Sequence, residues 1–222
     1  MKNHSFIPCL CTLVLLAGTS QGLERRITDG LHIAPVTSGD IQDDTIAFGW
    51  QGAYDFSRWL TTEISYSYFE DSLPLSILDS ILLPVGSGVD THVHEVAVTG
   101  RIHIWHNEVA SLYAGAGINM LFINEDAEDV NRAIAANRAS SPISEFSVDI
   151  KKDLGYHGAI GGEISLHEHW EIFAEWRYVL QEAETDFNLV SPAANGQTTT
   201  RKIDRDIGFN HQMVRFGVNY RF

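Results

Sequence analysis

The sequence predicts an all-β fold, in which eight antiparallel strands close into an up-and-down transmembrane β-barrel. Three observations predict it. Apolar and polar side chains alternate along eight segments of about ten to fifteen residues, as they do when a strand has two different faces. The connections are alternately short and long, which is typical of barrels with short periplasmic turns and long extracellular loops. No run of about eighteen apolar residues occurs in the body of the chain, so no transmembrane helix is expected.

Each expected strand has one face of large apolar or aromatic side chains and one face of small, polar or charged ones. The strands, in chain order, are Ile27–Val36, Thr45–Phe56, Trp59–Phe69, Thr91–Trp105, Val109–Phe122, Lys152–Leu166, Trp170–Gln181 and His211–Phe222. Their apolar faces carry, in the same order, Leu31 and Ile33; Phe48 and Trp50; Ile64 and Tyr66; Val98 and Ile102; Leu112 and Ile118; Ile160 and Ile164; Ile172 and Trp176; Val214 and Phe216. The first and last strands are expected to pair, because an open edge would expose unpaired amides to lipid.

The alternative fold is a secreted soluble β-sandwich or a lipocalin-type barrel, in which large apolar residues point inward. In this chain the polar set is rich in Gly, Ala and Ser, whereas the apolar set is large and aromatic. Small residues suit a narrow lumen better than a soluble core, so the pattern favours the membrane barrel. Aromatic residues near strand ends, such as Tyr54, Trp59 and Trp170, match the interfacial belts of membrane proteins.

The N-terminal segment, residues 1–22, is expected to be a secretory signal peptide, and residues 23–222 the barrel domain. Lys2 begins a weakly basic start, an apolar core follows, and Ser20-Gln21-Gly22 provides small residues for cleavage. Both cysteines of the chain, Cys9 and Cys11, lie in this leader, so no disulfide is expected in the mature protein. A secreted, cysteine-free, β-patterned chain fits the Gram-negative envelope.

The last strand ends with an aromatic residue on its apolar face. That face carries Phe216, Val218, Tyr220 and Phe222. A terminal Phe on such a face resembles the closing strand of bacterial outer-membrane barrels. Together with the eight alternating segments, it makes nearly the whole mature chain similar to the eight-stranded outer-membrane β-barrel family, typified by the transmembrane domain of OmpA and by OmpW-like proteins. The resemblance implies location in the bacterial outer membrane, contact with outer-membrane lipids and lipopolysaccharide, and recognition of the terminal face by the barrel-insertion machinery and periplasmic chaperones.

The predicted inward face collects opposite charges in a narrow space. Such charges are costly unless they are paired, so we expect an ion-pair network that fills the lumen rather than an ion path. The residues expected in it are Glu63, Glu95, Arg101, His103, His157, Glu163, Glu175, Arg177 and Arg215.

The sequence provides no complete metal, cofactor or catalytic motif. The pairs His92-x-His94 and His167-x-His169 have no third ligand at a recognisable spacing, so no metal site is expected. The glycine-rich segment 158–162 lies inside an expected strand with no helix after it, which argues against a phosphate-binding loop or other cofactor site. No nucleophile stands beside a base, so the chain is not expected to be an enzyme.

The long connections and their flanks carry most of the acidic residues. The chain has 29 Asp and Glu against 15 Lys and Arg, a net charge of −14, which argues against nucleic acid as a partner. Residues 125–138 have helical character, so a short helix is expected in the third long loop. The second long loop is unusually apolar, and Leu75, Ile77 and Leu82 are expected to fold over the mouth, touch the outer leaflet or contact a partner.

Two function classes remain from the sequence. The first is a structural or surface-interaction barrel that serves membrane integrity, adhesion or recognition, with a monomer favoured. The second is an OmpW-like conduit or binding site for small hydrophobic molecules, with the apolar second loop at a lateral entry.

Overall fold

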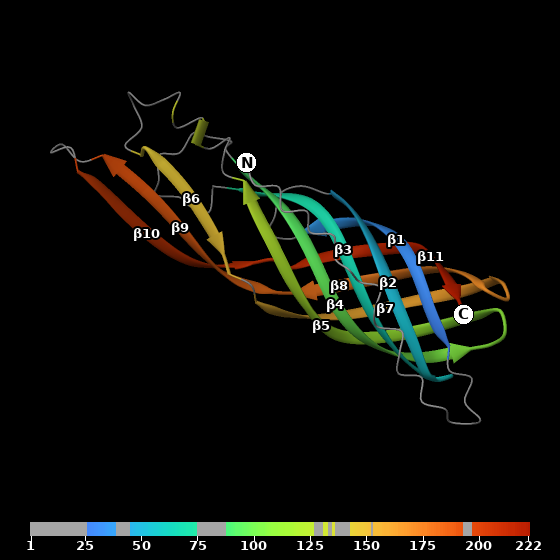
Figure 1. Ribbon diagram of the computed structural model, residues 1–222. Helices are drawn as coiled ribbons and strands as arrows, with labels where there is room; N and C mark the ends of the chain where they lie inside the picture. The colour runs from blue at the N-terminus through green and yellow to red at the C-terminus, as the bar shows by residue number, and fades with distance from the viewer. Residues whose placement is uncertain are drawn as a thin grey trace.

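The computed structural model describes residues 26–38, 45–74, 88–126, 131–132, 135, 143–151, 153–192 and 197–222. Eight strands form a closed barrel: β1 (Ile27–Ser38), β2 (Thr45–Ser57), β3 (Leu60–Pro74), β4 (Gly88–His106), β5 (Ala110–Asp126), β7 (Leu154–His167), β8 (Trp170–Leu180) and β11 (His211–Arg221). Three more form a separate sheet: β6 (Glu145–Ile150), β9 (Glu182–Pro192) and β10 (Thr198–Gly208). Figure 1 shows this sheet projecting beyond the barrel at one end.

The barrel has the predicted up-and-down topology. Its strand order is β1-β11-β8-β7-β5-β4-β3-β2, and every neighbouring pair is antiparallel. The first and last strands close it, with Leu31 opposite Val218 and Ile33 opposite Phe216. The eight strands predicted from alternation are therefore confirmed, with ends that move by a few residues.

The short turns lie at one end of the barrel, here named the turn end, and the long connections lie at the other, the loop end. Polar side chains shape these turns. The Ser57 hydroxyl accepts a hydrogen bond from the Leu60 amide at 3.2 Å. The Asn107 side-chain oxygen accepts from the amides of Val109 and Ala110 at 2.9 and 2.8 Å. Each satisfies backbone donors that the strand ladder leaves free.

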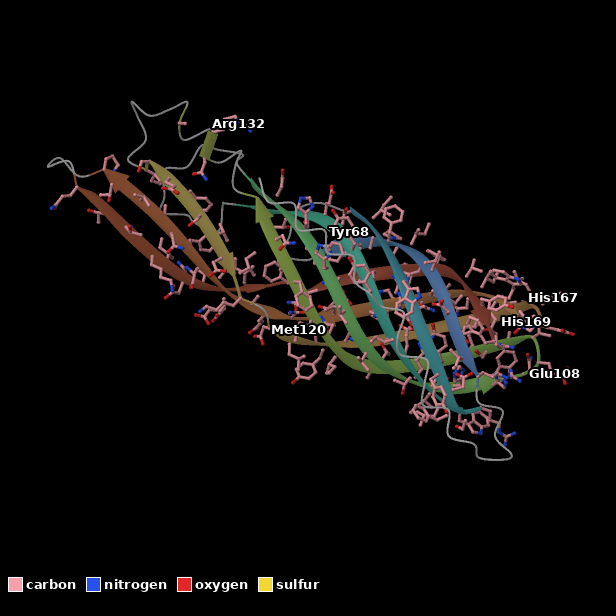
Figure 2. All side chains as sticks on the ribbon, viewed as in Figure 1. Tyr68, Glu108, Met120, Arg132, His167 and His169 are labelled. Atoms are coloured by element: carbon pink, nitrogen blue, oxygen red, sulfur yellow. The ribbon has the colours of Figure 1, made fainter. Side chains whose placement is uncertain are left out.

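The burial pattern shows that the bulky side chains point outward. Leu31 is 68% exposed and Ile104 65%, whereas Arg177 and Arg215 are fully buried on the inside. Large apolar side chains thus cover the outer wall, Met120 of β5 among them (Figure 2), and polar side chains line the lumen. This polarity rules out the soluble alternative, because a soluble barrel would bury the apolar face.

The long loop expected between the strands Trp170–Gln181 and His211–Phe222 is instead largely β-strand. The chain continues from β8 into β9 and returns through β10 into β11, so the β8–β11 hairpin extends beyond the barrel. At the bend, the Phe209 amide donates to the Gln181 carbonyl at 2.7 Å, and the Gln181 amide donates to the Asn210 side chain at 3.0 Å. Strand β6, from the third long connection, pairs with β9.

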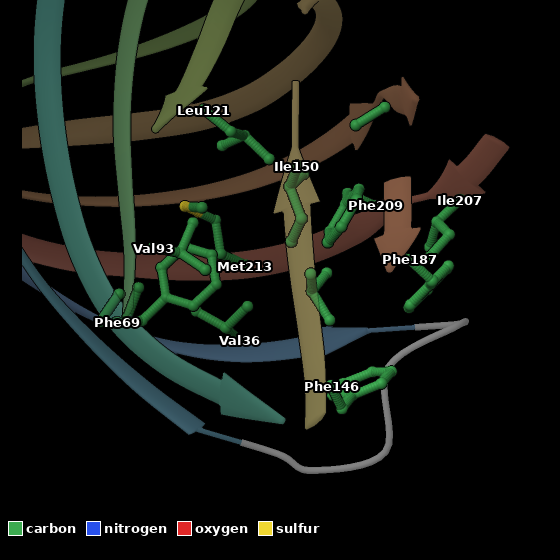
Figure 3. Close-up of a cluster of buried hydrophobic side chains, with 14 of the residues drawn as sticks. Val36, Phe69, Val93, Leu121, Phe146, Ile150, Phe187, Ile207, Phe209 and Met213 are labelled. Atoms are coloured by element: carbon green, nitrogen blue, oxygen red, sulfur yellow. The ribbon is translucent and has the colours of Figure 1, made fainter. Parts of the chain in front are cut away.

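An apolar cluster joins the projecting sheet to the mouth of the barrel (Figure 3). Inward side chains at the loop end of the barrel strands meet side chains from β6, β9 and the segment before β11. Its larger members are Val36, Phe69, Val93, Leu121, Met213, Phe146, Val148, Ile150, Phe187, Leu189, Ile207 and Phe209, all at most 8% exposed. The interior therefore changes from polar at mid-height to apolar at the loop end.

The remaining sequence-based expectations concern the N-terminal segment and the second and third long loops. Of residues 125–138, where a short helix was expected, Glu125 and Asp126 instead belong to β5, whereas Asn131, Arg132 and Ala135 are helical. The other positions of that segment lie outside the described residues. The signal peptide and Leu75, Ile77 and Leu82 lie outside the described residues. Among the described residues, no helix is long and apolar enough to cross a membrane.

Candidate functional site: the charged interior

Three arginine side chains lie at mid-height inside the barrel, where they are buried from solvent. Arg101 comes from β4, Arg177 from β8 and Arg215 from β11, and each is at most 1% exposed. A buried guanidinium is tolerated only when carboxylates and hydrogen bonds replace its water. The Arg101 guanidinium also lies over the Tyr113 ring, 4.4 Å from its centroid, which adds a cation–π contact.

Two carboxylates bridge all three arginines. Glu175 Oε1 lies 2.7 Å from Arg215 Nη1 and 3.0 Å from Arg177 Nη2, and its Oε2 lies 3.0 Å from Arg101 Nη2. Glu63 Oε1 lies 2.9 Å from Arg177 Nη2 and 3.0 Å from Arg215 Nη1, and Glu63 also contacts Arg101. The side chains of β3, β4, β8 and β11 are thereby linked across the lumen.

Glu163 and Glu95 extend this network toward the two ends of the barrel. Glu163 pairs with Arg101 at 3.2 Å on the turn side. Glu95 lies 3.9 Å from Arg177 and accepts a bond of 3.0 Å from His211 Nε2 on the loop side. The other ring nitrogen of His211 faces the Phe209 carbonyl at 3.0 Å. Because both nitrogens face acceptors, His211 and Glu95 must share an additional proton. With His211 as imidazolium, four cations face four carboxylates.

The sequence placed nine residues in the interior network, and the structure directs all nine side chains inward. Seven of them form the ion-paired group just described. The side chains of His103 and His157 form hydrogen bonds with threonine hydroxyls rather than with charged groups. His103 Nε2 meets the Thr61 hydroxyl at 2.9 Å, and His157 Nε2 meets the Thr99 hydroxyl at 2.8 Å.

Other network members were not singled out from the sequence. Gln51 accepts a short hydrogen bond from Arg215, Ser65 accepts one from Arg177 at 3.1 Å, and the Tyr113 hydroxyl donates to Glu175 at 3.1 Å. His211 was likewise not singled out. Alternation identifies such positions as inward, but it does not show which of them meet across the lumen.

A polar cavity of about 640 Å³ opens below the network at the turn end. Its lining includes Asp55, Thr61, His103, Glu163 and Glu171. The acids there are already engaged: Thr61 donates to Asp55 at 2.6 Å, Ser165 donates to Glu171 at 3.2 Å, and Glu163 pairs with Arg101. Within the described residues, no group of three or more His, Cys, Asp or Glu side chains is placed to hold a metal ion.

The projecting sheet carries a second set of ion pairs on its outer face. Lys202 on β10 lies 2.9 Å from Asp186 on β9, and Lys151 lies 2.6 Å from Glu184. The hydrogen bond from Lys202 lowers the pKa of the Asp186 carboxyl. The hydrogen bond to Glu184 raises the pKa of the Lys151 ammonium. These pairs keep the charged face of the sheet in register while its other face packs on the barrel mouth.

The C-terminal strand presents its apolar face to the outside. Phe216, Val218 and Phe222 are 48%, 43% and 72% exposed, and the Tyr220 ring meets the Trp170 ring edge-on with 5.1 Å between centroids. The four residues predicted as an insertion signal therefore share one outward surface at the closing strand.

Comparisons with known proteins agree with this architecture. The family model described as outer membrane protein beta-barrel domain matches residues 8–222. The outer membrane protein OprG from Pseudomonas aeruginosa is similar in structure, with a TM-score of 0.65, 18% identity, and coverage of 90% of this chain and 96% of that chain. Neisserial surface protein A is similar with a TM-score of 0.54 and 10% identity, over 89% of this chain and 97% of that chain. The outer membrane protein AlkL is similar with a TM-score of 0.51 and 14% identity, over 93% of this chain and 94% of that chain. No curated protein matches the chain in sequence.

Proposed function

Because the chain belongs to the outer membrane protein β-barrel family, we propose that it is a closed, non-enzymatic barrel of the bacterial outer membrane that acts at the cell surface. In this proposal the ion-paired interior is a plug, and the projecting sheet is the part that meets the surroundings. Short turns then face the periplasm, and the loop end faces outward. The role is one of surface interaction or envelope integrity rather than solute passage through the lumen.

The observation that supports this proposal is the cross-lumen network of Glu63 and Glu175 with three arginines. Each of these carboxylates contacts arginine side chains from β4, β8 and β11, so the network crosses the lumen and closes it at mid-height. Arg177 and Arg215 have no exposed surface, so solvent does not reach the centre from either end. Paired in this way, the charges are locked in position and do not offer a mobile path for ions.

We expect the purified protein in planar lipid bilayers to show no large, steady open steps. A Glu63→Ala, Arg215→Ala double variant shortens two side chains of the network and is expected to produce such steps. Single-channel recording measures the conductance of the unaltered protein and of the double variant. The control is Glu168→Ala, at an exposed turn. Steady conductance from the unaltered protein would contradict the plug.

A second function is favoured by the apolar cluster at the mouth. Val36, Phe69 and Met213 from the barrel belong to the same buried apolar cluster as Phe146 and Phe187 from the sheet, above the plug. Apolar side chains of this kind are the lining that a binding site or lateral route for small hydrophobic molecules needs. Any passage would have to leave the barrel above the network, because the lumen below is polar and filled.

Uptake of a small aromatic hydrocarbon by expressing cells tests this second function. A conduit predicts that a Phe146→Ser, Phe187→Ser double variant lowers the uptake rate about tenfold, since two buried aromatic contacts are lost. Asn188→Ser, on the neighbouring position of β9, is the matched control. Equal uptake in all three strains, with the barrel folded, would leave only the surface role.

We also propose that the outward face of Phe216, Val218, Tyr220 and Phe222 is recognised by the barrel-insertion machinery and its periplasmic chaperones. The support is that these side chains lie on one outward face of the closing strand, with Phe216, Val218 and Phe222 exposed. A Phe222→Ser variant is expected to accumulate in the periplasm in pulse-chase fractionation, whereas Phe56→Ser, at another exposed aromatic near a turn, is not. Equal insertion rates of the two variants would contradict this role.

A further inference from the structure

Strand β10 is an edge of the projecting sheet. The sheet order is β10-β9-β6, so β9 is the only strand beside β10 in the part of the chain that the structure describes. Figure 1 shows β10 as the outermost strand of the projection. From Thr198 to Asp206 its side chains are exposed on both faces, except for the half-buried Ile203. An edge strand of this kind presents backbone groups with which another extended chain can pair.

The opposite edge of the sheet, on β6, is blocked. Asn131 Nδ2 donates to the Phe146 carbonyl at 2.9 Å, and the Phe146 amide donates to Asn131 Oδ1 at 2.8 Å. One side chain thereby occupies both backbone groups of Phe146, which must point away from β9. The two edges of the sheet therefore differ, and β10 is the one that has room for a further strand.

The backbone of β10 directs alternate residues to the open edge. In an antiparallel ladder, the N–H and C=O groups of one residue point to the same side, and those of the next residue point to the other. Phe146 points away from β9, so Leu189, which lies opposite Phe146, directs its groups to Arg201 of β10. Ile203 and Arg205 face β9 in the same way. The residues whose backbone groups face the open edge are therefore Thr200, Lys202, Asp204 and Asp206.

Two unpaired arginines flank an apolar side chain on one face of β10. Arg201 and Arg205 are exposed, and neither forms an ion pair or a side-chain hydrogen bond with the described residues. Ile203 lies between them and packs against the apolar cluster. The carboxylates of the three strands all lie on the other face of the sheet: Glu145, Asp149, Glu182, Glu184, Asp186, Asp204 and Asp206. In a chain with a net charge of −14, this face of β10 is therefore locally basic.

The third cation of β10 is already engaged. Lys202 Nζ lies 2.9 Å from Asp186 and 3.1 Å from Asp204, on the face that carries the carboxylates. A strand added at the open edge would therefore meet a neutralised pair on that face and two uncompensated guanidinium groups on the other. The charge that such a strand needs is negative, and it is needed on one face only.

We propose that β10 accepts an extended acidic segment of a partner protein as a fourth strand of the projecting sheet. This rests on the proposed surface role, because the sheet meets such a partner only where the loop end faces outward. Arg201, Ile203 and Arg205 direct their backbone groups to β9, so an antiparallel fourth strand would approach their side chains most closely. The segment that fits carries an acidic, an apolar and an acidic residue at alternate positions, with neutral polar residues between them.

A second copy of β10 does not fit this edge. A symmetric antiparallel pair centred on Ile203 would set Arg201 opposite Arg205 of the other copy. Centred on any other residue from Arg201 to Arg205, it would set a charged side chain opposite itself. Like charges directly opposite each other destabilise a strand pair. An acidic partner is thus the occupant whose charge complements this edge.

The test uses the whole folded protein in detergent micelles and a fluorescein-labelled, end-capped peptide with Glu-Thr-Val-Thr-Glu between flanking threonines. Fluorescence anisotropy measures its dissociation constant. An Arg201→Gln, Arg205→Gln double variant is expected to bind about tenfold more weakly, because two cross-strand charge pairs are lost. The control is Arg58→Gln with Lys202→Gln, which removes the same charge from the turn end and from the other face of β10. It is expected to bind like the unaltered protein, and heat-modifiable gel mobility establishes that each variant is folded.

Two N-methylated forms of the peptide test strand addition itself. Methyl groups on the two threonines beside valine block the amides that would face β10, so binding is expected to be lost. A methyl group on the valine amide, which would point away from β10, is expected to leave binding unchanged. On the protein side, Thr200→Pro removes an amide that faces the open edge and keeps the pairing with β9, so it is expected to weaken binding.

Equal binding by the arginine variant and its control, or equal binding of the two N-methylated peptides, would overturn the proposal. So would a sulfated oligosaccharide that requires both arginines while no peptide binds, which assigns this face to polyanions, or a dimer that Thr200→Pro dissociates. The bilayer recordings are independent of this readout. Absent peptide binding overturns the fourth strand even in a barrel that stays closed, whereas steady conductance contradicts the plug alone.

Discussion

Glu175→Gln is expected to lower the free energy of unfolding by about 3–5 kcal/mol, the range for removing one member of a buried ion-paired group. Glu175 contacts Arg101, Arg177 and Arg215, all buried. The amide has one acceptor oxygen and no charge, so of the two carboxylates that contact all three guanidinium groups only that of Glu63 would remain. Equilibrium unfolding in urea from lipid vesicles, followed by tryptophan fluorescence, measures the change.

Two comparisons separate this effect from a general sensitivity of the barrel. Glu168→Gln, at an exposed turn, is expected to change the free energy of unfolding by less than about 0.5 kcal/mol. Glu175→Gln combined with Arg177→Met is expected to recover part of the loss, since one unpaired cation is removed with its anion. A loss below about 1 kcal/mol for Glu175→Gln alone would show that the network contributes little to stability.

Gly217→Ala is expected to destabilise the closed barrel by about 3 kcal/mol, at the upper end for overpacking. Gly217 lies on β11 opposite His32 of β1, at the junction that closes the barrel. A Cβ atom there would lie 2.3 Å from the Leu31 carbonyl oxygen and 2.4 Å from the Phe173 ring. The carbonyl belongs to the closing strand pair, so the backbone itself would have to move. The fraction of protein with folded mobility in unboiled gel samples, and the urea midpoint, measure the change.

Gly158→Ala is the matched control for this substitution. Gly158 also lies in the middle of a barrel strand, but a Cβ atom there would have no neighbour within 4 Å. It is expected to be neutral or to stabilise by about 0.4–1 kcal/mol, because alanine restricts the unfolded chain. Equal effects at the two positions would mean that close packing at the β1–β11 junction does not limit closure.

The projecting sheet shows where prediction from the sequence stopped short. Acidic residues in the segment 182–192 favoured a solvated loop, yet Ala183, Thr185, Phe187 and Leu189 alternate with polar residues as in any strand. These side chains are buried because they pack with side chains of the neighbouring strand β6 and of the barrel mouth. β6 and the strands of the barrel mouth are distant from β9 in the sequence, so the residues around β9 did not predict that it joins a sheet.

The sequence by itself determined the eight barrel strands, their two faces and their order of connection. That information is local, because a strand exposes alternate side chains to lipid and lumen regardless of which strand lies across from it. Only the tertiary structure decided that Glu63 and Glu175 meet all three arginines, that His211 joins Glu95, and that His103 and His157 bond to threonines. Contacts across a lumen depend on the tilt and stagger of the closed sheet, which are properties of the whole barrel.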